Sequence, residues 1–200
     1  MITNVLTSSN VWTRAGFATV FLDRDGVINE KVPEGRYVSS ESEFRILPGV
    51  PEAIANLNRE GIRVIVVSNQ RGVALGDLTL EIVDRIHALL QERLNEYGAH
   101  VDAIYICPHD RGACSCRKPS PGLYLEAKNR FPEIMPHTSV MIGDSLSDIE
   151  FGYRIGMRTI WIAGSPDLRK PGWEVAEKLA DQTCSSLPEA VAFLQRTCRP

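Results

Sequence analysis

The sequence predicts an α/β fold, a Rossmann-like parallel sheet with helices on both of its faces. Short apolar runs alternate along the chain with amphipathic stretches, and Gly or Pro stands at most of the junctions between them. Strands separated by helices are typical of βαβ units, whose strands run parallel. The 200 residues suit one domain, and 44% hydrophobic with 24% charged residues is a globular composition. A disordered chain and a coiled coil are therefore excluded.

The predicted strands are short runs rich in Val and Ile, too continuous for a sheet with one face in water. In chain order they cover residues 18–22, 62–67, 101–106, 139–142, 158–162 and 182–184. The predicted helices cover residues 50–60, 79–97, 121–130 and 147–155, then a segment containing Trp173 and a final one from about residue 188. The longest helix has a core stripe at helical spacing, formed by Val83, Ile86, Leu90 and Leu94.

Residues 1–16 are interpreted as an N-terminal extension, and residues 17–200 as one domain. The extension has neither a basic start nor a long apolar run, so we expect no secretory signal. No stretch approaches the roughly 18 apolar residues of a membrane span. The net charge is −3 and neither half of the chain is basic, which disfavours nucleic acid as a partner. We expect a cytoplasmic monomer that binds neither membranes nor nucleic acid.

Small polar residues stand at the ends of three predicted strands, as Asp23, Ser68 and Asp144. In open parallel sheets ligands bind at the carboxyl ends of strands, so these side chains are candidates for one site. Each of them alone could equally well start a turn. A further carboxylate, Asp25, stands two residues after Asp23, which suits a division between a nucleophile and an acid–base group. Three carboxylates together offer the oxygen ligands that Mg²⁺ prefers.

The complete set of motifs resembles the haloacid dehalogenase superfamily of phosphatases. The residues that carry the resemblance are, in order, Asp23-x-Asp25-Gly26, Ser68, Lys118 and Gly143-Asp144-x-x-x-Asp148. The resemblance covers the chain from about residue 17 to residue 196. It implies the fold of that superfamily and a phosphoaspartyl mechanism.

The resemblance implies catalytic roles for four residues. Asp23 attacks phosphorus, and Asp25 protonates the leaving alcohol and then activates water. Ser68 and Lys118 stabilise the phosphoryl group during its transfer.

The resemblance also implies a catalytic Mg²⁺, held by the Asp23 carboxylate, the Asp25 main-chain carbonyl and Asp144. Asp148 is open to two interpretations. It either orders water or orients Lys118, or it is simply an acidic residue in the first turn of a helix, where the helix dipole favours it.

Four residues of metal-ligand type lie within ten positions, namely Cys107, His109, Cys114 and Cys116. Three thiolates and an imidazole match a closed, tetrahedral, structural Zn²⁺ site. The alternatives are scattered buried cysteines or a disulfide, which a reducing compartment disfavours. Arg117 and Lys118 follow directly, so a zinc ion would determine where two cations lie. The remaining cysteines, Cys184 and Cys198, are interpreted as bystanders.

The chain resembles a capless subgroup of the superfamily that carries such a cysteine-rich loop, because the motifs leave no room for a cap domain. The substrate contacts implied by this resemblance are Asn29, Tyr37, Asn69, Gln70, Arg71 and Arg117. One branch of the subgroup removes the 7-phosphate from D-glycero-D-manno-heptose 1,7-bisphosphate, and another acts on histidinol phosphate. Arg117 suits bidentate binding of a second phosphate.

We therefore expect a Mg²⁺-dependent phosphatase whose substrate is a phosphorylated sugar, with the heptose bisphosphate as the first choice. Histidinol phosphate is the alternative substrate. A polynucleotide 3′-phosphatase is disfavoured because the chain has no basic stripe. A non-catalytic module that binds a phosphosugar stays open, since a fold alone does not determine function.

Overall fold

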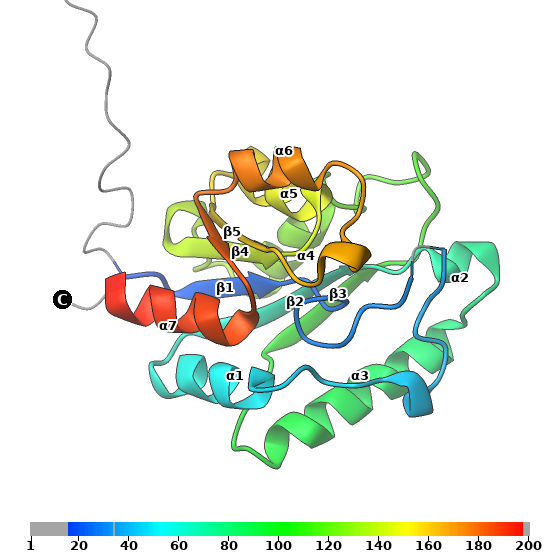
Figure 1. Ribbon diagram of the computed structural model, residues 1–200, viewed down its shortest axis with the longest axis horizontal. Helices are drawn as coiled ribbons and strands as arrows, with labels where there is room; N and C mark the ends of the chain where they lie inside the picture. The colour runs from blue at the N-terminus through cyan, green and yellow to red at the C-terminus, as the bar shows by residue number, and fades with distance from the viewer. Residues whose placement is uncertain (1–15, 34, 198–200) are drawn as a thin grey trace, which may run out of the picture.

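The computed structural model describes residues 16–33 and 35–197, and these confirm the predicted fold class. They form a six-stranded sheet with the order β3-β2-β1-β4-β5-β6, in which every neighbouring pair is parallel (Figure 1). The strands are β1 (Thr19–Leu22), β2 (Arg63–Asn69), β3 (Ala103–Cys107), β4 (Ser139–Gly143), β5 (Arg158–Ile162) and β6 (Gln182–Cys184). All but one residue of the predicted N-terminal extension, and Cys198, lie outside the described residues.

Helices cover both faces of the sheet (Figure 1). They are α1 (Val50–Arg59), α2 (Gly72–Leu75), α3 (Leu80–Asn95), α4 (Gly122–Arg130), α5 (Leu146–Ile155), α6 (Trp173–Leu179) and α7 (Leu187–Thr197). Helices α1, α3 and α7 share one core cluster, whereas α4 and α5 contribute to a second cluster and α6 packs on α5. Among the described residues, none of the helices has the length and apolar character needed to cross a membrane.

Four short helical elements were not predicted. They are helix α2 and the 3₁₀ turns η1 (Glu41–Glu43), η2 (Pro136–Thr138) and η3 (Pro166–Leu168). A segment of three or four residues is too short to show a hydrophobic period, so its conformation is decided by the elements around it.

The central strand β1 is buried on both of its faces. Val20 and Leu22 pack into the cluster of α1, α3 and α7, whereas Phe21 packs into the cluster of α4 and α5. Successive side chains of a strand point to opposite faces, and here both faces are covered. This is why the run is continuously apolar until Asp23, where the strand reaches the edge of the sheet.

Strand β2 extends two residues further than predicted. Ser68 and Asn69 lie in register with Ile106 and Cys107 of β3, so the parallel ladder continues after the last apolar residue. The hydrophobic pattern ended the predicted strand at residue 67 because polar side chains normally mark a turn. The extension places Ser68 and Asn69 at the carboxyl edge of the sheet with a fixed backbone.

We predict that Leu90→Ala lowers the free energy of unfolding by about 2–5 kcal/mol, because it opens a cavity under α3. Leu90 is fully buried in the cluster shared by α1, α3 and α7. The matched control on the same helix is Glu92→Ala, an exposed position where the change stays within about 0.5 kcal/mol. Urea titration of both variants checks this, and equal losses would contradict the assigned core.

Candidate active site

Three buried carboxylates meet at the carboxyl edge of the sheet. Asp23 follows β1, Asp144 follows β4 and Asp148 lies in the first turn of α5. They offer oxygen atoms that all lie within 4.8 Å of one another, and each residue is 6% exposed or less. Asp144 approaches Gly26 so closely that a Cβ there would lie 2.3 Å from Asp144 Oδ2, and Gly26 also has a φ of +95°. The turn after β1 therefore requires glycine.

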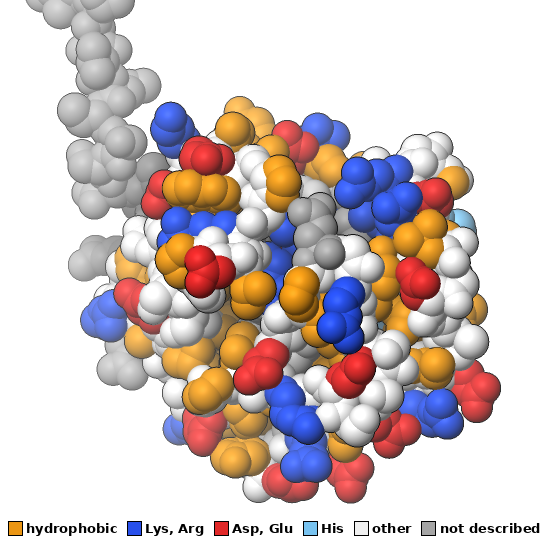
Figure 2. Space-filling view, turned by 45° about the vertical axis from the view of Figure 1, so that its right-hand side comes forward, with side chains coloured by type: hydrophobic (Ala, Val, Ile, Leu, Met, Phe, Trp, Pro, Cys, Tyr) orange, Lys and Arg blue, Asp and Glu red, His pale blue; other side chains and the backbone are white. Residues whose placement is uncertain are grey.

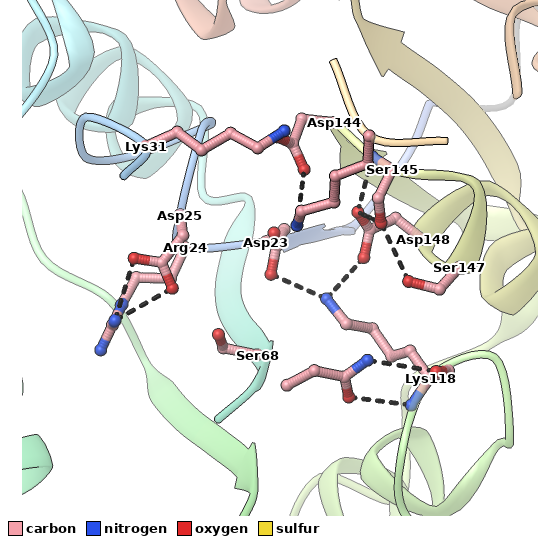
Figure 3. Close-up of polar contacts among 12 residues, drawn as sticks. Asp23, Arg24, Asp25, Lys31, Ser68, Lys118, Asp144, Ser145, Ser147 and Asp148 are labelled. Atoms are coloured by element: carbon pink, nitrogen blue, oxygen red, sulfur yellow. Dashed lines mark hydrogen bonds and ion pairs between the residues drawn. The ribbon is translucent and has the colours of Figure 1, made fainter. Parts of the chain in front are cut away.

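Lys118 supplies the buried positive charge for this cluster (Figure 3). Its Nζ lies 2.8 Å from Asp23 Oδ1 and 2.6 Å from Asp148 Oδ1, and it donates to the Val67 carbonyl at 2.6 Å. The Asn69 side chain holds the Lys118 backbone, since its Nδ2 donates to the Lys118 carbonyl at 3.1 Å and its Oδ1 accepts from the Lys118 amide at 3.0 Å. The sequence predicted Asn69 only as a substrate contact, and this anchoring role was missed.

Both interpretations of Asp148 describe part of what the structure contains. Its Oδ2 accepts from the Ser145 amide at 3.0 Å and from the Ser145 hydroxyl at 2.6 Å, as in a capping box at the start of α5. Its Oδ1 lies beside the Lys118 ammonium. One carboxylate thus caps a helix and orients the buried lysine.

Two further lysines at the cluster were not predicted. Lys31 Nζ lies 2.6 Å from Asp144 Oδ2, and Lys170 Nζ lies 3.7 Å from Asp144 Oδ1. They come from loops that follow β1 and β5, at the same edge of the sheet. The available sequence signal was a basic residue in a loop at that edge, which is too common to single out either lysine.

Burial, together with the neighbouring Asp148 and Asp144 carboxylates, raises the pKa of Asp23 to about 7, although the Lys118 and Lys170 charges act to lower it. Carboxylates this close together favour a bound cation, and such a cation would restore the ionised form of Asp23. Asp144 Oδ1 is buried, and none of the described groups donates a hydrogen bond to it. The cluster therefore fits a hard divalent cation such as Mg²⁺.

Asp25 is held apart from this cluster, facing Arg24 (Figure 3). Arg24 Nη2 donates to both of its carboxylate oxygens at 2.9 Å. Asn29 Nδ2 donates to Oδ1 at 3.0 Å and Gln70 Nε2 to Oδ2 at 2.9 Å. Burial raises the pKa of Asp25, but the Arg24 charge and the hydrogen bonds from Asn29, Arg24 and Gln70 lower it more, so the net pKa is below its usual value.

Two predicted substrate contacts, Asn29 and Gln70, need correction. Their exposed fractions are 0% and 1%, and their amides bind Asp25. Gln70 Nε2 also lies 2.9 Å from Ser68 Oγ, so it joins the hydroxyl and the carboxylate. Sequence proximity to the motifs placed these residues near the site but could not tell which way each side chain points.

Arg24 and His87 complete this network, and the sequence reasoning missed both. Arg24 is 1% exposed, and its Nη1 lies 3.4 Å from Nε2 of His87 on α3. Burial lowers the pKa of His87 to about 4, the Arg24 charge lowers it as well, and Asp25 opposes this. His87 is therefore neutral at pH 7.

A cleft of about 880 Å³ opens above the carboxylates. The other predicted contacts, Tyr37, Asn69, Arg71 and Arg117, line it, together with Arg36, Arg111 and Arg169, which were not predicted. Figure 2, which brings the carboxyl edge of the sheet forward, shows groups of basic side chains on this face. Arg71 pairs with Asp110, whereas Arg117 keeps one buried nitrogen, Nη1, without a hydrogen-bond partner among the described residues.

The four predicted zinc ligands lie together beside this cleft. The Sγ atom of Cys114 is 3.4 Å from that of Cys107 and 3.3 Å from that of Cys116, and His109 Nδ1 lies 3.2 Å from Cys116 Sγ. All four ligand atoms are within 4.8 Å of one another, and the cysteines are free thiols rather than a disulfide. Bonds of about 2.3 Å to a central zinc place tetrahedral ligands about 3.7 Å apart. The cluster therefore suits such an ion.

Known proteins are similar to this chain. A family profile described as HAD-hydrolase-like matches residues 115–189. A D-glycero-α-D-manno-heptose-1,7-bisphosphate 7-phosphatase of Mycobacterium tuberculosis is 42% identical over 68% of this chain and 72% of its own. The 7-phosphatase of Vibrio cholerae that acts on the β anomer is 36% identical over 88% of this chain and 96% of its own. The chain belongs to this family of phosphatases.

A solved structure agrees with that membership. The D,D-heptose 1,7-bisphosphate phosphatase of Bordetella bronchiseptica, described as complexed with magnesium and phosphate, matches with a TM-score of 0.78 and 30% identity. The match covers 89% of this chain and 98% of the other. The predicted superfamily and fold are confirmed.

We predict that His87 makes the protein less stable below pH 6.5. The unfolded chain binds a proton near pH 6.5 and the folded chain only near pH 4, so the stability contribution is present above pH 6.5 and is lost as the pH falls between these values. The expected loss is on the order of 3 kcal/mol. Denaturant titrations from pH 7 to pH 4 compare the wild type with His87→Gln, which lacks the titration. Parallel stability curves would contradict the assignment.

Proposed function

We propose that this phosphatase removes the 7-phosphate from D-glycero-D-manno-heptose 1,7-bisphosphate in a Mg²⁺-dependent reaction. The observation that carries the proposal is the buried pairing of Asp23 with Lys118 at 2.8 Å, beside the Asp144 and Asp148 carboxylates. A carboxylate held this way at the end of β1 is positioned to act as a nucleophile. The names of the relatives supply the substrate.

The reaction proceeds in two steps. An Asp23 oxygen bonds to phosphorus, and the bond from phosphorus to the leaving oxygen breaks while Asp25 gives that oxygen a proton. Asp25 takes up this proton in the complex, where the negative charge of the bound phosphate raises its pKa. Asp25 then takes a proton from water as the water attacks the aspartyl phosphate, which restores Asp23 and releases phosphate. Lys118 and Ser68 stabilise the phosphoryl oxygens.

Asp23, Asp144 and the Asp25 main-chain carbonyl are the groups that would hold Mg²⁺. When bound, this ion reduces the repulsion between the phosphate and the carboxylate that attacks it. Asp148 binds Ser145 and the Lys118 ammonium, which favours an orienting role for it.

The charge of the cleft favours a bisphosphate over histidinol phosphate. The residues that line it include Arg36, Arg71, Arg111 and Arg117, and only Glu150 and Asp167 are acidic among the described lining residues beyond the catalytic carboxylates. Guanidinium groups bind a second phosphate and repel the amine of histidinol phosphate. Arg117, with its unpartnered Nη1, is the first choice for this contact. The monomeric state and cytoplasmic location stay predictions.

Phosphate release from the α and β anomers of the heptose bisphosphate, from histidinol phosphate and from p-nitrophenyl phosphate tests the proposal, with Mg²⁺ and with EDTA. We expect Mg²⁺-dependent turnover with the highest kcat/KM on one heptose anomer. Asp23→Asn should lower kcat at least about 1,000-fold, because it removes the nucleophile. Asp84→Asn, the same change on the exposed side of α3, should leave it unchanged. Full activity of Asp23→Asn would rule out the phosphoaspartyl route.

We further propose that Cys107, His109, Cys114 and Cys116 bind one structural Zn²⁺. Burial raises the pKa of Cys114, but the Arg117 backbone amide and the neighbouring thiols lower it to about 6, which favours a thiolate. The loop continues directly into Arg117 and Lys118, so its shape determines where both cations lie.

Metal analysis of the purified protein should find one zinc ion per chain. Cys116→Ser should lose it, lower the melting temperature and reduce kcat, because Lys118 is no longer held in place. Cys184→Ala removes a thiol from β6 and should retain the zinc. A zinc-free protein whose melting temperature is unaffected by Cys116→Ser would refute the site.

A further inference from the structure

We propose that Arg24 is a positioning residue that fixes the direction of the Asp25 carboxylate, and that His87 on α3 holds Arg24 in place for this purpose. The inference rests on the proposed function, in which Asp25 is the acid–base group. It concerns the residue between the two motif aspartates and a histidine outside the motifs, and it joins helix α3 to the chemistry at the edge of the sheet.

The burial of Arg24 is unusual for a residue with a structural role alone. Its side chain is among the largest fully buried ones, although it carries a charge. Burying a guanidinium is costly, and replacing a buried ion pair by apolar groups is often neutral or stabilising. Its Nε also has no hydrogen-bond partner among the described residues. Stability alone therefore gives little reason for an arginine here.

The contacts of Arg24 are suited to orienting a carboxylate. Its Nη2 lies 2.9 Å from each oxygen of Asp25, whereas Asn29 and Gln70 each bind one oxygen. Among these three donors, Arg24 is the charged one, and it alone contacts both oxygens. The Asp25 side chain is 25% exposed and lines the cleft, so the held carboxylate still presents an open side to a ligand.

His87 supports Arg24 from the other side. It lies between Val83 and Leu90 on the buried stripe of α3, and its Nε2 is 3.4 Å from Arg24 Nη1. A neutral imidazole can accept a hydrogen bond from the guanidinium, whereas a protonated one would repel it. Its pKa near 4 keeps it neutral at pH 7, because burial and the Arg24 charge both lower that pKa. A polar residue in an otherwise apolar stripe thus has a partner.

The orientation of Asp25 matters most when the leaving group needs a proton. The bond from phosphorus to the sugar oxygen breaks as Asp25 transfers its proton to that oxygen, so a misdirected carboxylate slows this step. p-Nitrophenolate is a stable anion and leaves without such help. The ratio of kcat/KM between these two substrates therefore reports on the positioning of Asp25, since kcat/KM covers the steps up to departure of the leaving group.

The experiment measures kcat/KM of Arg24→Met and Arg24→Lys on the heptose bisphosphate and on p-nitrophenyl phosphate. We expect Arg24→Met to lower kcat/KM about 100-fold on the heptose bisphosphate and only a few-fold on p-nitrophenyl phosphate. Arg24→Lys, which keeps one donor and the charge, should lie between this variant and the wild type. An equal fall on both substrates, or no fall, would overturn the proposal. A wild type inactive on both substrates would instead refute the proposed function.

A second pair of variants keeps the test valid if the Arg24 variants do not fold. His87→Leu removes the acceptor for Arg24, and His87→Gln restores one. We expect His87→Leu to show the same substrate-selective loss at about 10-fold, and His87→Gln to recover most of it. Asp84→Asn is the control on the same helix. Equal behaviour of the Leu and Gln variants, or a loss shared by both substrates, would contradict the role of His87.

Discussion

Three carboxylates, buried within 4.8 Å of one another, have to be neutralised at the edge of a parallel sheet, and much of the molecule is arranged around this requirement. An unpaired charge in such a place is strongly destabilising, so Lys118 has to reach both Asp23 and Asp148. Lys118 belongs to a loop without regular structure. Its backbone is therefore held by Asn69 at the end of β2, and the preceding residues form a Cys/His cluster that could hold a metal ion.

The two acidic residues of the first motif have opposite environments although one residue separates them. Burial among carboxylates raises the pKa of Asp23, whereas Arg24 and two amides lower that of Asp25 below its usual value despite burial. These shifts belong to the ligand-free site: a bound divalent cation would ionise Asp23, and the negative charge of a bound phosphate would favour a proton on Asp25. The turn at Gly26 lets Asp144 approach the chain directly after Asp25.

The residues that the sequence identified and those it missed differ in how their role arises. Asp23, Asp144 and Lys118 were predicted because each has a place in an ordered set of motifs. Lys31, Lys170 and His87 were missed, since each is one charged or polar residue in a loop or helix whose role depends on what lies opposite. Asn29 and Gln70 were placed at the right site but facing the wrong way, because a motif does not report the direction of a side chain.

The sequence by itself determined the order of the strands and longer helices along the chain, the fold family and the reaction type. It also singled out the Cys and His residues of one candidate metal cluster, and Asp23 and Asp144 of the other. The elements follow from hydrophobic periodicity, which is a local property, whereas the family and the reaction type are what the resemblance of the ordered motifs implies. Only the tertiary structure decided which cations neutralise the carboxylates, that Asn69 holds the Lys118 backbone, and that Arg24 and His87 lie behind Asp25. Such contacts join residues far apart in the chain, 95 positions for Lys118 and Asp23 and 113 for Lys31 and Asp144, and packing alone brings them together.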